Sequence, residues 1–366
     1  MRIRTFLLAL ALTGPSAFAQ IAPAPQSTSS AVMDDEDILG TPKAFREFVV
    51  KATLPYQGYT MKTRALVRAV FSKPEDGGLG MVYANDKTRT VSEVWKDRKA
   101  NCLSLTAFYV AACRAIQVDV KFADSEGINH WVRQGDLILH ERHVVAVLPI
   151  NPIDTMVADF SAEPRMGAHR IVFLSEERFK ALYHSNRAVE LLQAGQTGEA
   201  MREAEASLRE DSRSGIGWNI YGVMLKASGQ AVKAEAAFRK ALEVDPKDGA
   251  ACGNLEELCR SQGRDSEAVA FRDLGLRLRD RDPYFHAFIA KENLAAGKVD
   301  DALAQIQRAL KLQRMEPDFY LILAQAELNR GEHNAATKAV QKAIHWSLPD
   351  QRKRMESKLA LIQSQT

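Results

Sequence analysis

The stretch GIGWNIYGVMLKASGQAVKAEAAFRKALEVDPKD, residues 215–248, decides the fold of the C-terminal half of this chain. Its length of 34 residues recurs as a spacing between five glycines, Gly195, Gly229, Gly263, Gly297 and Gly331. A column of alanines at 200, 234, 268, 302 and 336 keeps the same step, and a third column holds only Ser, Ala or Gly. Glycine adopts the left-handed conformation that ends a helix, and small residues let two helices approach closely. The repeat therefore predicts five stacked helical hairpins, each of which buries its apolar face against its neighbours.

The residues of the fullest unit indicate the kind of repeat. It carries Trp218, Tyr221, Gly222, Leu225, Gly229, Ala234, Phe238, Ala241 and Pro246. This set resembles the tetratricopeptide repeat, although the other four units are degenerate and the third has Cys252 and Arg272 where Trp218 and Phe238 stand. The resemblance covers about 180–349 and implies an all-α solenoid domain over 179–366, whose groove binds a protein or peptide. The predicted first helices mix apolar, acidic and basic residues, so the class of ligand stays open.

The N-terminus predicts export. Arg2 and Arg4 precede a short apolar run, and Ala17-Phe18-Ala19 has the pattern of a signal-peptidase site. We expect a signal peptide over 1–19, a flexible leader over 20–34 and a periplasmic or secreted protein. After cleavage no stretch is long and apolar enough to span a membrane.

Charge and cysteine content narrow the class of protein. The formal charge is +3 at pH 7, and the predicted signal removes two basic residues, so a nucleic-acid partner is not expected. The four cysteines lie in two helical patterns at separations too long for a disulfide within a helix, Cys102 with Cys113 and Cys252 with Cys259. We therefore expect free thiols. The sequence leaves the oligomeric state undetermined.

The order of the predicted elements in residues 35–178 indicates an α+β domain. Helical patterns at 43–52, 61–72, 90–97 and from Cys102 to about Gln117 precede short β-rich runs. These runs lie at 118–122, 137–139, 143–148, 156–160 and 171–174, separated by Gly, Asn and Pro. Helices followed by strands predict a mostly antiparallel sheet.

Three residues of this domain suggest a reaction. Asn101 is a favoured N-cap residue, so Cys102 would begin a helix whose dipole lowers the pKa of its thiol. His143 begins an apolar strand pattern and would act as the base. Asp159 interrupts a second apolar strand pattern, where a buried carboxylate needs a partner such as a histidine ring. Each has an ordinary alternative: a small buried cysteine, a structural histidine, and an aspartate that caps a strand end.

The order and setting of these residues resemble the transglutaminase-like superfamily. The matching segments are Arg98-Lys99-Ala100-Asn101-Cys102-Leu103-Ser104, Arg142-His143-Val144 and Val157-Ala158-Asp159-Phe160. The resemblance covers about 40–175 and implies a papain-like core, with Cys102 as nucleophile, His143 as base and Asp159 as the residue that orients the histidine. The chain departs from the family at Ala100, often Gly, and at Leu103, Trp in animal-type members. No oxyanion-hole side chain is identifiable, and Trp95 and Trp131 are only candidates.

Two hypotheses follow. In the first, the chain is an exported cysteine acyl-transferase or peptidase that acts on amide bonds and needs no metal or organic cofactor, with repeats that recruit a protein partner. In the second, the transglutaminase-like fold is catalytically inactive and serves with the repeats as a scaffold. A metal site at His130, His140, Glu141 and His143 is disfavoured, because residues three apart on a strand face opposite sides.

Overall fold

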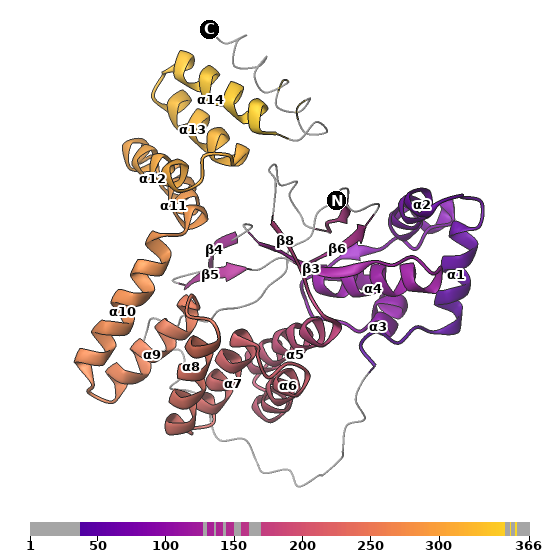
Figure 1. The fold of residues 1–366 in the computed structure, drawn as a ribbon, viewed down its shortest axis with the longest axis horizontal. Coiled ribbons are helices and arrows are strands. Elements are labelled where there is room, and N and C mark those ends of the chain that lie inside the picture. Colours follow the sequence, from indigo (N-terminus) through magenta and orange to yellow (C-terminus); the bar gives the residue numbers. More distant parts are fainter. Residues whose placement is uncertain are drawn as a thin grey trace.

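A computed structural model describes residues 37–126, 130–134, 137–141, 144–149, 155–160 and 170–347, with Arg352 and Glu356 beyond them. The predicted signal peptide and leader lie outside this part. Figure 1 shows an α+β part followed by an arc of paired helices that begins at α5 beside that part. Within the described ranges, no helix has both the length and the apolar character that crossing a membrane requires.

The helices of the α+β part match the predicted ones within a few residues. They are α1 Lys43–Thr53, α2 Tyr59–Phe71, α3 Val91–Asp97 and α4 Cys102–Ala115, with a 3-10 turn η1 at Pro74–Asp76. The start of α3 is fixed by a capping box, in which Thr90 Oγ1 accepts from Glu93 N and the Glu93 carboxylate accepts from Thr90 N.

The main sheet has four antiparallel strands in the order β7-β6-β3-β8. Its strands are β3 Lys121–Glu126, β6 Val144–Pro149, β7 Thr155–Ala158 and β8 Arg170–Phe173. Two smaller pairings complete the part: β4 His130–Gln134 with β5 Leu137–Glu141, and the parallel pair β1 Val82–Tyr83 with β2 Lys99–Ala100. The predicted strand at 118–122 starts three residues later, and sequence reasoning missed β1, β2 and β4, of which β1 and β2 span only two residues each.

Helix α4 lies at the centre of the α+β core. All twelve residues from 102 to 113 are buried, because α4 packs on β6 on one side and on α1 and α3 on others. Phe108 meets Phe45 edge-on with ring centroids 4.9 Å apart, and Val144, Ala146 and Leu148 of β6 belong to the same cluster. A helix that is apolar on every side is a core helix, which explains why this segment shows no polar face.

The C-terminal half contains the five predicted hairpins. They pair α5 Glu176–Gln193 with α6 Thr197–Glu210, α7 Gly215–Ala227 with α8 Ala231–Val244, α9 Gly249–Ser261 with α10 Asp265–Asp280, α11 Pro283–Ala295 with α12 Val299–Leu312, and α13 Pro317–Asn329 with α14 His333–Trp346. All five repeated glycines have φ between 72° and 80° and follow the first helix of their unit. The helix-ending role assigned to the glycine column is therefore confirmed.

Two of the four degenerate units keep one hydrogen bond of the Trp218 unit with a different side chain. In three units the residue in the Trp218 column bonds to the carbonyl oxygen of the residue six positions earlier. These bonds are Trp218 Nε1 to Ser212 O, His286 Nε2 to Asp280 O and Tyr320 OH to Arg314 O, each 2.9 Å long. Substitution by His286 or Tyr320 thus preserves the hydrogen bond to the loop before the hairpin in the fourth and fifth units.

The array has a weakly packed seam between α10 and α11. In the Phe238 column the other units bury Ala204, Phe238, Ile306 and Val340, whereas Arg272 on α10 is exposed. Leu276, one turn further, is 49% exposed, although the equivalent residues of the other units are half-buried. As a result, the apolar cluster of the first three units shares no residue with that of the fourth and fifth.

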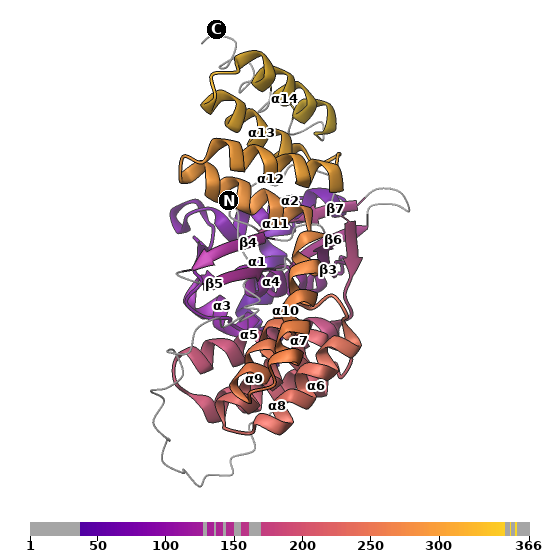
Figure 2. The same cartoon turned by 90° about the vertical axis from the view of Figure 1, so that its left-hand side faces the viewer.

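The first repeat helix also belongs to the α+β core. Phe179 of α5 stacks on Phe122 of β3 with centroids 3.8 Å apart, and Leu182 and Tyr183 are buried in the same cluster. The domain boundary expected at 178 therefore falls inside α5. A second junction lies at the fourth hairpin of the arc, where α11 lies against β4 (Figure 2).

Candidate functional site

Cys102 is the first residue of α4, as the sequence predicts. The Asn101 side chain caps the helix: its Oδ1 accepts from Ser104 N at 2.9 Å. Cys102 therefore lies in the first turn of α4, where the helix dipole favours a thiolate. Cys102 is only 1% exposed, so this thiol lies beneath the surface.

The backbone leading into α4 is held by β1. Val82 N donates to Arg98 O at 2.9 Å and Ala84 N donates to Ala100 O at 3.0 Å. Between α3 and β2 the chain turns sharply at Arg98, whose φ of 55° lies in the left-handed region that non-glycine residues rarely adopt. These contacts fix the direction in which Asn101 and Cys102 begin the helix.

A buried arginine ties the preceding loop to the same helix. Arg89 N donates to Ser104 Oγ at 2.7 Å, and its guanidinium, 5% exposed, bonds to Asp86 and Asp97. The hydrogen bonds from Arg89 lower the pKa of Asp86 to about 2. The loop at 86–90 is therefore held in two ways: by the ion pairs of the Arg89 guanidinium and by the hydrogen bond from Arg89 N to Ser104.

We expect this anchor to weaken in acid. A carboxylate whose pKa is lowered by folding stabilises the protein above its unfolded pKa near 4, and that contribution is lost as the pH falls from about 4 to 2. Because Asp86 is 55% exposed, solvent screening limits the effect to about 1 kcal/mol. Urea unfolding of the wild type and Asp86→Asn at pH 6 and pH 3 measures it: the difference between the two proteins should shrink at pH 3. An equal difference at both pH values would contradict this assignment.

The face of α4 that carries Cys102 is turned toward β6. Thr106, one helical turn after Cys102, donates from Oγ1 to Val144 O at 3.3 Å. Val144 is the first residue of β6 and directly follows His143 in the sequence, while His143 itself lies outside the described residues. The start of β6 therefore contacts α4 one helical turn after Cys102.

Asp159 differs from the expectation. Strand β7 ends at Ala158, which pairs with Ala146 of β6, and Asp159 follows with an exposed side chain. The prediction of a carboxylate buried within a strand is therefore wrong. Asp159 follows β7, which pairs with β6, the strand that starts at Val144.

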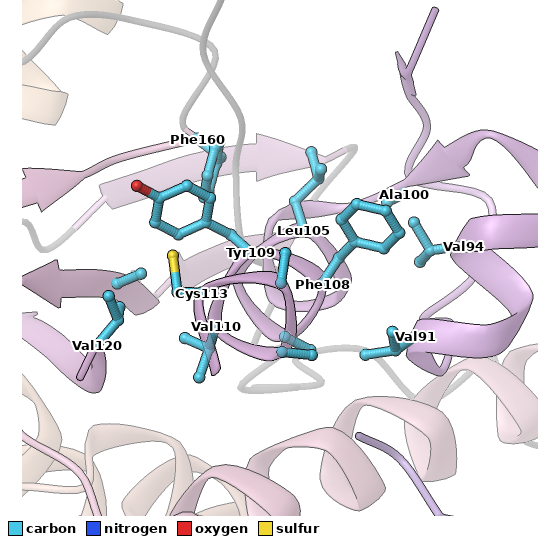
Figure 3. Packing of buried hydrophobic residues seen from close by; sticks show 14 of the residues in the cluster. Val91, Val94, Ala100, Leu105, Phe108, Tyr109, Val110, Cys113, Val120 and Phe160 are labelled. Carbon is cyan, nitrogen blue, oxygen red and sulfur yellow. The ribbon is translucent and has the colours of Figure 1, made fainter. Parts of the chain in front are cut away.

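A mainly apolar cleft of about 340 Å³ lies beside Asp159, between α2, α4 and β7. Tyr109 is one of its lining residues and meets the Phe160 ring edge-on at 5.3 Å, with Cys113 on the same side of α4 (Figure 3). Arg64 supplies the one cationic side chain among the described lining residues. Burial raises the pKa of the Cys113 thiol to about 12, so Cys113 is a poor nucleophile compared with a thiol at a helix start.

Neither tryptophan candidate for an oxyanion hole is supported. The Trp95 ring is covered by the Arg98 guanidinium, 3.8 Å from its centre, and packs against Phe45 and Phe48. Trp95 is therefore a packing residue of α3, and the side chain of Trp131 lies outside the part that can be described. In the described ranges no three His, Cys, Asp or Glu side chains gather as a metal site would require.

Sequence reasoning missed the residues that support the Asn101 cap. Thr88 donates to the Glu190 carboxylate from its N and its Oγ1, and Asn101 Nδ2 donates to Thr88 Oγ1 at 2.8 Å. Thr88 and Glu190 are 102 positions apart. No spacing rule links a loop residue to a repeat helix at that distance, so the sequence held no signal for them.

Comparison with known proteins identifies the array. A model described as tetratricopeptide repeat matches residues 186–251 and 289–349, and a second model with that description matches 225–292. A search of the curated proteins gave no match. The repeat assignment made from the glycine and alanine columns is confirmed.

Several solved structures are similar to the chain. MamA from Desulfovibrio magneticus RS-1 is 17% identical over 46% of this chain and 94% of its own, with a TM-score of 0.26. TTC0263, a tetratricopeptide protein of Thermus thermophilus, is 18% identical over 48% and 94%, with a TM-score of 0.25. Pseudomonas aeruginosa pilF is 17% identical over 51% and 91%, with a TM-score of 0.28.

Proposed function

We propose that this chain, whose C-terminal half is an array of tetratricopeptide repeats, is an exported transglutaminase-like cysteine acyl-transferase or peptidase. Cys102 is the nucleophile, His143 the base and Asp159 the residue that orients the histidine. The observation that carries the proposal is the setting of Cys102. It begins an N-capped helix, and that helix packs on the sheet at the point where β6 starts, directly after His143.

The reaction needs only side chains and the substrate. His143 takes the proton of Cys102, and the thiolate sulfur attacks the carbonyl carbon of an amide. The C–N bond then breaks, the amine leaves with the proton held by His143, and a thioester remains on Cys102. Water or a second amine attacks the thioester and returns the thiol, which gives hydrolysis or transfer respectively. In this proposal, the N–H groups at the start of α4 that are not bonded to Asn101 would stabilise the tetrahedral oxyanion.

The array supplies the partner-binding role. Stacked tetratricopeptide hairpins present an extended concave surface built from the first helix of each unit, and such surfaces bind peptides and proteins. The arc leads from α5, within the α+β core, to α11, beside β4. A protein partner held in this arc would be kept close to the α+β part, which suits an enzyme that acts on protein substrates.

The test compares the alkylation rates of the cysteines in the full chain. Burial raises the pKa of the Cys113 and Cys252 thiols to about 12, so both are almost wholly protonated at pH 7. We expect iodoacetamide to label Cys102 at least about 100-fold faster than either, because its helix start favours the thiolate. Peptide mass spectrometry measures each rate. Cys102→Ala should lose the fast label, and Cys113→Ala, the matched control, should keep it.

A second function is favoured by the burial of Cys102. A thiol that is 1% exposed fits a structural cysteine in an inactive fold, which would act with the array as an interaction scaffold. In that case Cys102 would react no faster than Cys113 at any pH. Cys102→Ala would then leave the function of the protein in cells intact, whereas deleting the array would abolish it.

A further inference from the structure

Glu190 is a repeat-helix residue that is bonded into the α+β part. It lies on α5, and its carboxylate accepts from Thr88 N at 2.8 and 2.9 Å and from Thr88 Oγ1 at 2.7 Å. An ionised carboxylate only accepts hydrogen bonds. The Thr88 hydroxyl must therefore donate to Glu190, which leaves its oxygen free to accept from another group.

That other group is the cap of the Cys102 helix. Asn101 Nδ2 donates to Thr88 Oγ1 at 2.8 Å, so the amide nitrogen of Asn101 is turned toward Thr88. The amide oxygen is consequently turned toward α4, where it accepts from Ser104 N. The Ser104 N–H fixes the position of the Asn101 amide oxygen, and Glu190, which takes the hydroxyl hydrogen of Thr88, holds the amide nitrogen in the matching orientation.

We propose that Glu190 is a positioning residue for Cys102: through Thr88 it fixes the Asn101 cap and with it the first turn of α4. This rests on the proposed function, in which Cys102 is the nucleophile. The first repeat helix, α5, then helps to position a residue of the α+β part. A partner that shifts α5 would alter the setting of the thiol without touching it.

The test measures the rate of Cys102 alkylation by iodoacetamide from pH 5 to 10 in the full chain. Thr88→Val and Glu190→Leu should each lower the rate at pH 7 by about fivefold to tenfold, the scale of a lost N-cap bond, and move the midpoint of the profile to higher pH. Thr88→Ser keeps the hydroxyl and should keep the wild-type profile. Glu199→Leu, at an exposed glutamate on α6, is the matched control and should change nothing. Profiles of Thr88→Val and Glu190→Leu that superimpose on the wild type would overturn the proposal.

A second readout separates this proposal from the proposed function. The Ser104 amide hydrogen is held by Asn101, so its exchange with solvent should quicken by about fivefold to tenfold in Thr88→Val and Glu190→Leu but not in Glu199→Leu. If wild-type Cys102 is unreactive while Ser104 exchange responds in this way, the enzyme assignment fails and the relay to the cap stands. If Ser104 exchange is the same in all variants, the relay itself is refuted.

Discussion

Replacing Phe179 with alanine is expected to lower the free energy of unfolding by about 3–5 kcal/mol, the range for a large aromatic side chain removed from a core. Phe179 is fully buried, and its ring stacks on Phe122 with an angle of 14° between the planes. Its loss leaves a cavity between α5 and β3. Because α5 is also the first helix of the array, the damage reaches both halves of the chain.

Phe173→Ala is the matched control. Phe173 lies on β8 of the same sheet, but it is 52% exposed, so its removal should cost less than about 1 kcal/mol. Urea unfolding followed by circular dichroism measures both values. Equal losses for the two variants would mean that α5 is not a stabilising element of the α+β core.

The second large effect concerns truncation. A chain that ends at Leu174 should show no cooperative unfolding transition, because it lacks Phe179, Leu182 and Tyr183, which lie in the same apolar cluster as α4 and β6. A chain that ends at Arg281 should unfold cooperatively, because the cut falls at the seam between the apolar clusters of the first three and the last two repeats. The physical reason is that stacked repeats gain stability from the interfaces between neighbours, and at the α10–α11 seam Arg272 and Leu276 stay exposed.

Thermal melts of the two chains decide this prediction, and a third chain ending at Arg213 serves as the control. It restores α5 and its partner α6 to the α+β part, so it should regain a cooperative transition. Cooperative unfolding of the chain that ends at Leu174 would show that the α+β part folds without α5. Loss of cooperativity in the chain that ends at Arg281 would show that the fourth and fifth repeats hold the first three together.

Local patterns in the sequence were enough to predict the repeats and the start of the Cys102 helix. The 34-residue spacing repeats a local requirement, a left-handed glycine after each first helix, and the structure meets it five times. The Asn101 cap is likewise local, since its bond reaches only three residues along the chain. Features that depend on neighbours within one turn or one repeat period leave a signal that can be read directly.

Contacts between segments that are far apart in the sequence could not be predicted from local patterns. Asp159 was expected to be buried because its neighbours are apolar, but its exposure depends on where β7 ends and on what covers it. The boundary expected at 178 was placed where the repeats begin, although α5 is shared between both cores. The sequence by itself determined the array, the free thiols and the helix that begins at Cys102. Only the tertiary structure decided that Thr88 and Glu190 meet beside that helix, because a contact across 102 residues is set by how α5 packs on the sheet and not by any period along the chain.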